Sequence, residues 1–246
     1  MATTTSTEDT GLLDYLAPQF EKETGTNLKW VATGTGKALK MGENCDVDIL
    51  LVHAPEAEKK FVDAKFGLDR NEVMYNDFVI IGPVNDPAKI SGKSTSEAFK
   101  DIKDKNANFL SRGDNSGTHQ KELSMWEKVT KIVPEKDSWY VQTGQGMIAT
   151  INMASEKGGY TLTDRGTWIK YESQKGDKNN MKIVVENDSS LFNQYSVITI
   201  NQEKCPNVKT KLAKDFTNWI VKDDTQKLIG DFKLLNKPLF IPNAKK

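Results

Sequence analysis

Four short runs of small and hydroxylated residues each stand at the beginning of an amphipathic stretch. They lie at residues 3–7 (TTTST), 33–36 (TGTG), 111–118 (SRGDNSGT) and 143–147 (TGQGM). The first turn of a helix has backbone N–H groups without an intrahelical partner, and it carries about half a positive charge. Several such helix starts that converge on one point would hold an oxyanion mainly through neutral hydrogen-bond donors. These residues therefore indicate noncovalent capture of a small anion.

The run at residues 111–118 is the most informative of the four. Thr and Ser are common helix N-caps, so a single TTTS or TGTG run is ordinary. By contrast, Arg112 stands beside a glycine, and Ser-Gly-Thr follows it at the predicted helix start. The guanidinium group is planar and permanently charged, which suits it to pairs of oxygen atoms. We therefore expect Arg112 to supply the one full positive charge of the site.

The elements that must position these runs alternate between strands and helices, as is typical of the α/β class. Residue patterns predict strands at residues 26–32, 46–52, 70–81, 108–110, 159–163, 182–185 and 195–201. Helical periodicity and start signals predict helices at residues 7–20, 33–41, 55–62, 94–105, 111–131, 142–155, from 164 onward, 208–221 and 224–232. Residues 3–6 (TTTS) are predicted as a loop that follows a strand.

Two extended stretches, at residues 80–87 and 186–197, are predicted to carry the chain between two lobes. Lobe one would contain residues 1–82 and 195–246, and lobe two would contain residues 83–194. Two α/β lobes joined by two crossovers form a hinged clamp, and ligands favour such domain interfaces. We therefore expect the ligand site in the cleft between the lobes.

Composition excludes several classes of function. The chain has 246 residues and a formal net charge of zero, which argues against nucleic-acid binding because that needs a basic face. Its longest apolar run, residues 78–81, is far shorter than a membrane span. Cys45 and Cys205 lack the CxxC spacing and the histidine partners of a zinc site. The sequence leaves open whether they are two buried thiols or one long-range disulfide.

Six motifs, taken together and in order, carry a family resemblance. They stand at residues 2–13, 34–39, 46–55, 111–119, 146–147 and 160–167. They resemble the tungstate-binding periplasmic component of ABC transporters, the TupA type. The resemblance implies a two-lobed, type II periplasmic binding protein with a mixed sheet and flanking helices in each lobe. It also implies capture of tungstate, or molybdate, and delivery to a membrane permease, without enzymatic activity or a cofactor. We expect a monomer.

The resemblance assigns the oxyanion to hydroxyl and backbone donors from both lobes, with the metal held only through its oxygens. These residues are Thr4, Thr5, Ser6, Thr35, Arg112, Ser116, Gly117, Thr118, Gly146 and Met147. His119 is expected to support the site from beside it, and His53 is expected in a loop or on the hinge side. The choice between tungstate and molybdate stays open.

Three alternatives remain beside this interpretation. Phosphate-binding proteins carry an Arg-x-Asp-x-Ser-Gly-Thr run much like residues 112–118, so phosphate is the rival within the same class. A serine hydrolase would use Ser116 as nucleophile and His119 as base, although no GxSxG elbow is present. A cytoplasmic oxyanion sensor would need a DNA-binding element, and no basic helix-turn-helix is recognisable.

The resemblance also implies a periplasmic or otherwise extracytoplasmic location, either free or anchored to the membrane. The first residues show neither a basic n-region nor an apolar h-region. We therefore expect a signal segment to be absent from this sequence, and we leave open whether it was a plain or a lipid-anchor signal.

Overall fold

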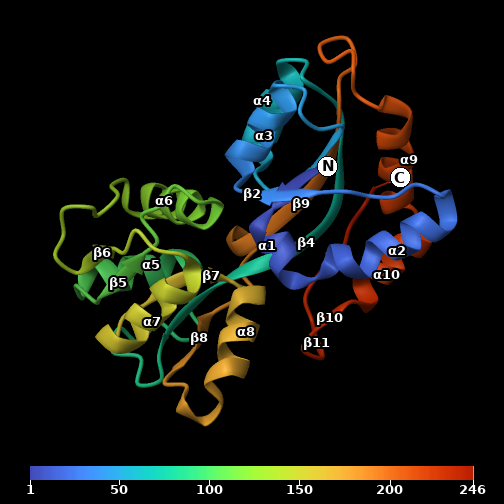
Figure 1. Cartoon of the computed structure of the whole chain (residues 1–246). Helices are drawn as coiled ribbons and strands as arrows, with labels where there is room; N and C mark the ends of the chain where they lie inside the picture. Colours follow the sequence, from blue (N-terminus) through green and yellow to red (C-terminus); the bar gives the residue numbers. More distant parts are fainter. Residues whose placement is uncertain (246) are drawn as a thin grey trace. The chain divides into compact units, whose positions relative to one another are not determined.

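The computed structural model describes residues 1–245, apart from the side chain of Ser6, and it divides the chain into two compact units. Unit 1 contains Met1–Asn76 and Asn193–Lys246, and unit 2 contains Asp77–Phe192. The chain passes between the units within strand β4 and at the start of strand β9 (Figure 1). The lobe boundaries predicted from the sequence lie within six residues of these two points. Strands and helices alternate in both units, which confirms the predicted α/β class.

Unit 1 begins with strands and helices in alternation and ends with helices and short strands. Its elements are β1 (Ala2–Thr4), α1 (Thr5–Thr10), α2 (Leu12–Thr24), β2 (Val31–Thr33), α3 (Thr35–Glu43), β3 (Ile49–Val52), α4 (Pro55–Asp63), the first part of β4 (Gly67–Pro83), β9 (Phe192–Ile200), α9 (Thr210–Val221), α10 (Asp223–Asp231), β10 (Lys233–Leu234), β11 (Lys237–Pro238) and β12 (Ile241–Pro242).

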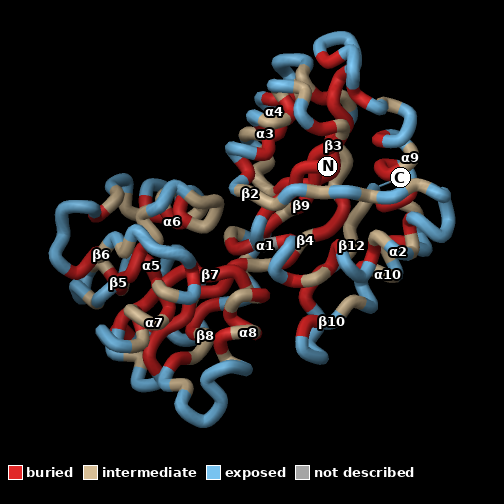
Figure 2. Tube along the Cα trace, in the orientation of Figure 1, coloured by how far each residue is buried: buried red, intermediate tan, exposed pale blue. Residues whose placement is uncertain are grey.

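The sheet of unit 1 is mixed and has the strand order β12-β4-β9-β3-β1-β2. Strand β1 is parallel to both of its neighbours, β2 and β3, whereas β9 is antiparallel to β3. Successive strand residues point to opposite faces of a sheet. Leu50 of β3 accordingly packs with Leu39 of α3 and Phe61 of α4, while Ile49 lines a cavity with Phe20 of α2. Helices therefore cover both faces, and β3 is buried along its whole length (Figure 2).

Unit 2 contains the second part of β4 and every element between it and β9. These elements are α5 (Thr95–Asp104), β5 (Phe109–Ser111), α6 (Gly117–Thr130), β6 (Tyr140–Gln142), α7 (Met147–Lys157), β7 (Thr161–Asp164), α8 (Arg165–Lys175), β8 (Met181–Val185) and the 3-10 helices η1 (Gly176–Lys178) and η2 (Ser189–Leu191).

In unit 2, β4 pairs antiparallel with β7 and β8, and β5 pairs parallel with β6. A single bridge between Phe109 and Tyr160 connects these two groups of strands. Successive side chains of β4 again point to opposite faces and belong to two different hydrophobic clusters. Ile80 packs with Trp126 of α6, and Ile81 packs with Trp168 of α8. Unit 2 thus has its own core on each side of β4.

The sequence-based boundaries differ from the structure at the N-terminus. The single helix predicted over residues 7–20 is wrong, because α1 ends at Thr10 and α2 begins at Leu12. Gly11 between them has φ +77°, a left-handed conformation that only glycine adopts without steric cost. The hydroxyl of Thr10 accepts from the N–H of Leu12, at 3.2 Å, and holds the break.

The loop predicted for residues 3–6 is also wrong, because Thr3 and Thr4 complete strand β1 and are buried. Thr is β-branched and suits a strand, and the hydroxyl of Thr3 donates to the carbonyl of Leu51. The strand predicted at residues 26–32 is confined to Val31–Thr33, and β6 and the short strands β10 to β12 were not predicted. Ser94 and Glu97 form a capping box at the start of α5.

Cys45 and Cys205 form a disulfide. It joins the end of α3 to the loop after β9, across 160 residues of sequence, with the two Cα atoms 5.3 Å apart. Cys205 is fully buried and belongs to the cluster between the sheet and helices α3 and α4. The disulfide therefore links the two segments of unit 1 that the sequence separates by the whole of unit 2. Among the described residues, no helix is long and apolar enough to cross a lipid bilayer.

Removal of this disulfide should destabilise the protein, since a cross-link over a long loop reduces the entropy of the unfolded chain. We expect the C45A/C205A variant to lose about 3 kcal/mol of stability, which lowers Tm by roughly 6–12 °C. Thermal unfolding with and without a reducing agent measures this. The reducing agent should lower Tm of the wild-type protein and leave Tm of the variant unchanged. An equal Tm for the wild type in both conditions would contradict the prediction.

Candidate functional site

The loop between β5 and α6 carries the predicted arginine. It leaves the sheet at Ser111, turns at Gly113 with φ +60°, and enters the helix at Ser116, the N-cap. The Ser116 hydroxyl accepts from the backbone N–H of His119, at 3.3 Å, and satisfies one donor of the first helical turn. A Cβ atom on Gly113 would lie 2.8 Å from Cβ of Gln142 in β6, so this turn requires glycine for both its φ angle and its space.

Arg112 is held in this loop by an ion pair between its Nη2 and Oδ2 of Asp114. Its Nε is buried and has no hydrogen-bond partner among the described residues. Burial alone would raise the pKa of Asp114, but hydrogen bonds from Ser116 and the charge of Arg112 together hold that pKa below its ordinary value. Asp114 thus stays ionised and orients the guanidinium, while a buried N–H donor of Arg112 remains unsatisfied. A buried donor without an acceptor is costly unless a ligand supplies one.

His119 is buried in the first turn of α6, and its ring is held by the same loop. Its Nδ1 accepts from the backbone N–H of Asn115 at 3.0 Å, so Nδ1 is unprotonated and Nε2 carries the hydrogen. Burial lowers the pKa of this imidazole, which keeps the ring neutral. Nε2 has no partner among the described residues. His119 is therefore a neutral donor in the first turn of α6, and its supporting role at the site stays a prediction.

The same contacts contradict the hydrolase alternative. A nucleophile needs a base that accepts its proton. The Ser116 hydroxyl accepts from the main chain of His119, and the ring nitrogen Nδ1 is already an acceptor for Asn115. The imidazole and the hydroxyl therefore do not form a nucleophile–base pair.

The start of α7 is attached to the arginine loop. The N–H of Thr143 donates to the carbonyl of Ser111 at 2.9 Å, and the N–H of Gly144 donates to the carbonyl of Arg112 at 2.8 Å. Gly146 is the N-cap and has no side chain, so it cannot satisfy the N–H groups of the first turn of α7 as the hydroxyl of Ser116 does in α6. Met147, the first residue of α7, is buried. These bonds join the two loops that lead into α6 and α7.

In unit 1 the predicted residues follow two adjacent parallel strands. Thr4 at the end of β1 is opposite Thr33 at the end of β2, so α1 and α3 begin at the same edge of the sheet. Thr35 is the first residue of α3, and its buried hydroxyl has no partner among the described residues. Thr5 is exposed. The side chain of Ser6 lies outside what the structure describes.

Two predicted residues of unit 1 have other contacts. The hydroxyl of Thr4 lies 2.8 Å from that of Thr7 and is buried in the turn into α1. His53 follows β3, and its Nδ1 lies 2.8 Å from Oδ1 of Asn193, the first residue of the second segment of unit 1. Burial lowers the pKa of His53 to about 4. His53 is thus a neutral loop residue that contacts the start of the returning chain.

Sequence reasoning missed the buried carboxylate of Glu122. It accepts from the hydroxyls of Ser111 and Tyr140, each at 2.6 Å. The sequence contains one signal for Glu122, because it lies on the same face of its helix as the buried residues Met125 and Trp126. An acidic residue within an apolar helical stripe indicates a buried, hydrogen-bonded carboxylate.

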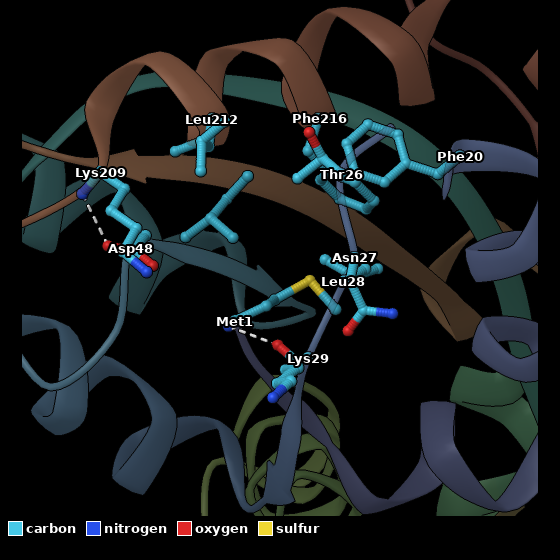
Figure 3. A pocket seen from close by; sticks show the side chains of 12 residues that line it. Met1, Phe20, Thr26, Asn27, Leu28, Lys29, Asp48, Lys209, Leu212 and Phe216 are labelled. Atoms are coloured by element: carbon cyan, nitrogen blue, oxygen red, sulfur yellow. Dashed lines mark hydrogen bonds between the residues drawn. The ribbon is translucent and has the colours of Figure 1, made fainter. Parts of the chain in front are cut away.

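Unit 1 also contains a cavity of about 300 Å³ (Figure 3). Its wall is mostly apolar, with Phe20, Leu212 and Phe216 among its lining residues. Of its charged lining residues, Asp48 and Lys209 lie together at one side, and Lys29 lies apart from them. None of the oxyanion-binding residues predicted from the sequence lines it. Within the described chain, His, Cys, Asp and Glu side chains form no group of three or more that could hold a metal ion.

Comparison with known proteins identifies the family. The model of a PBP superfamily domain matches residues 1–224. The tungstate-binding protein TupA of Campylobacter jejuni is 55% identical over 98% of this chain and 89% of its own. The chain belongs to the TupA family of the PBP superfamily.

Solved structures agree with this assignment. The tungstate-binding protein TupA from Desulfovibrio alaskensis G20 is 63% identical, with a TM-score of 0.95, and the match covers 100% of this chain and 98% of that one. The tungstate ABC transporter protein from Geobacter sulfurreducens is 48% identical over 94% and 97% of the two chains, with a TM-score of 0.80. The predicted TupA resemblance is confirmed, and so is an α/β fold of the periplasmic binding protein type with a mixed sheet and flanking helices.

Substitution of Gly113 by alanine should disturb the arginine loop. We expect Gly113→Ala to cost about 1–3 kcal/mol, from the left-handed φ and the contact with Gln142. Gly158→Ala is the matched control in unit 2, since Gly158 has the same φ of +60° and no atom within 4 Å of an added Cβ. Chemical denaturation measures both. Equal destabilisation by the two variants would show that the contact with Gln142 adds no cost.

Proposed function

We propose that this chain binds tungstate through its oxygens and delivers it to the permease of an ABC transporter. One observation carries the proposal: the starts of α6 and α7 are joined in unit 2, and Arg112 there keeps a buried Nε donor without an acceptor. The TupA relatives support the identity of the anion. As a member of that family, the chain is a substrate-binding protein and not an enzyme.

The donors come in two sets. In unit 2 they are the guanidinium of Arg112, the first-turn groups of Ser116, Gly117 and Thr118, and the N–H groups at Gly146 and Met147. In unit 1 they are Thr4, Thr5, Ser6 and Thr35, at the starts of α1 and α3. We propose that both sets bind the same oxyanion, as the two lobes of a type II binding protein would. Thr4 contributes through its backbone, because its hydroxyl is bonded to Thr7.

The hydrogen-bonding groups of the arginine loop favour an oxyanion that carries no proton. Hydrogen phosphate needs an acceptor for its proton, whereas tungstate needs only donors. Asp114 is the carboxylate of this loop, and both its oxygens are engaged by the loop itself. Oδ1 accepts from the N–H of Ser116 at 3.1 Å, and Oδ2 pairs with Arg112. This arrangement supports tungstate, with molybdate as the close analogue, over phosphate.

The partner and the location follow from the same proposal. A protein that hands an anion to a permease acts outside the cytoplasm, so we propose a periplasmic or extracytoplasmic location. Capture needs no cofactor, since hydrogen bonds and one guanidinium suffice to hold the anion.

A panel of oxyanions tests the proposal. Thermal unfolding is followed with tungstate, molybdate, sulfate and phosphate. With tungstate at roughly 1,000 times its Kd we expect stabilisation by about 4 kcal/mol and a rise in Tm of roughly 8–16 °C. Arg112→Ala should abolish the rise, whereas the control Lys136→Ala, which removes an exposed charge of unit 2, should retain it. A rise with phosphate alone would make the protein a phosphate-binding protein, and no rise with any anion would refute oxyanion capture.

A second test uses the unpartnered hydroxyl of Thr35. Thr35→Val removes a buried donor that has no partner in the protein, so Tm without ligand should stay equal or rise. Tungstate affinity, measured by calorimetry, should fall by about fivefold to tenfold. Thr225→Val is the matched control, because Thr225 is also a buried residue of unit 1 with an unpartnered hydroxyl among the described residues, and lies in α10. If the control weakens tungstate binding equally, Thr35 does not contact the anion.

A further inference from the structure

Glu122 is a buried carboxylate whose partners are all neutral. It lies in α6 and is 2% exposed. Its Oε2 accepts from the hydroxyl of Ser111 at 2.6 Å, and its Oε1 accepts from the hydroxyl of Tyr140 at 2.6 Å and from Nε1 of Trp126 at 3.0 Å. Burial raises the pKa of Glu122 to about 7, and the three hydrogen bonds offset part of that effect. A charged group so buried costs stability unless its donors are well placed.

The donors to Glu122 come from the elements that carry the oxyanion loops of unit 2. Ser111 is the last residue of β5, and the arginine loop follows it. Tyr140 is the first residue of β6, and the loop to α7 follows that strand. The two strands are parallel, with Ser111 opposite Gln142. One side chain of α6 therefore contacts both strands that precede the two helix starts.

The contact with Ser111 also fixes the orientation of that hydroxyl within the arginine loop. A hydroxyl has one hydrogen and two lone pairs. The Ser111 hydrogen goes to the carboxylate of Glu122, which leaves its oxygen to accept from the N–H of Gly113 at 3.3 Å. The chain of bonds from Gly113 through Ser111 to Glu122 thus fixes the turn beside Arg112.

We propose that Glu122 is a positioning residue for oxyanion binding, which holds the Ser111 hydroxyl so that the Gly113 turn presents Arg112 to the anion. This inference rests on the proposed function and extends it to a side chain that does not contact the anion. Glutamine at this position would fill the same space with different hydrogen bonding. Since Oε1 receives two donors, a glutamine would place its oxygen there and its NH2 group against Ser111. The NH2 group would compete with the Gly113 N–H for the Ser111 oxygen, and the Ser111 hydrogen would lose its acceptor, so the bond that holds the Gly113 turn would weaken.

A different role for Glu122 is that it only stabilises the packing of α6 on the sheet. Tyr140→Phe separates the two roles, because it removes a hydrogen bond to the same carboxylate, of the same 2.6 Å length, while the bonds from Ser111 to Glu122 and from Gly113 to Ser111 remain. Packing alone predicts that Tyr140→Phe and Glu122→Gln act alike on tungstate binding. Positioning predicts that only Glu122→Gln acts.

The experiment compares four variants by calorimetric titration with tungstate and by Tm without ligand. Glu122→Gln and Ser111→Ala should each weaken tungstate binding by about fivefold to tenfold. The double variant should be no weaker than the more affected single one, because both changes break one chain of bonds. Tyr140→Phe should lower Tm, because it removes one buried hydrogen bond. It should keep the tungstate affinity within about twofold, because the bond from Ser111 to Glu122 remains. Equal weakening by Tyr140→Phe, or wild-type affinity in Glu122→Gln, would overturn the proposal.

A second readout does not depend on the ligand. Hydrogen exchange of the Gly113 amide, followed by NMR in the ligand-free protein, should become faster in Glu122→Gln and stay unchanged in Tyr140→Phe. If the wild type does not bind tungstate but exchange of the Gly113 amide is faster only in Glu122→Gln, the proposed function is wrong. The conclusion that Glu122 positions the arginine loop is then still supported. An unchanged Gly113 amide in Glu122→Gln would refute that hold whether or not tungstate binds.

Discussion

Parallel pairing of adjacent strands is the constraint on which the candidate site depends in both units. In unit 1, β1 and β2 end side by side, and in unit 2, β5 and β6 do the same. A helix follows each of these strands directly or after a short loop, so the helix starts come in adjacent pairs. The N–H groups of a first helical turn need acceptors from outside the helix. Two such turns side by side form a natural site for an anion.

The arginine loop contributes the one guanidinium group of this arrangement. Arg112 and Asp114 cancel each other formally, and the chain as a whole has no net charge. In the proposed site, attraction for the anion comes from oriented N–H and O–H groups together with a guanidinium whose position Asp114 fixes. Fixed neutral donors select for geometry and for the absence of a proton on the ligand, whereas a surface rich in lysine would attract any anion.

Several groups of the proposed site lower the stability of the folded protein. The buried Nε of Arg112 and the buried hydroxyl of Thr35 have no partners among the described residues, and each such group opposes folding. The buried carboxylate of Glu122 adds a further cost. The aromatic cluster around Trp126 and the disulfide between Cys45 and Cys205 act in the opposite direction. Donors that are held in place before the ligand arrives lose little freedom on binding, which favours affinity.

The sequence by itself determined the α/β class, most helices, the arginine loop and the family, because local periodicity and contiguous motifs carry that information. It did not reveal the break at Gly11, the strand formed by Thr3 and Thr4, or strand β6, since short strands exist only through pairing with distant segments. The disulfide and the contacts of Glu122 were likewise decided by the tertiary structure. Each joins residues that the sequence separates, and only the packing of α6 against β5 and β6 places Ser111 and Tyr140 around one carboxylate.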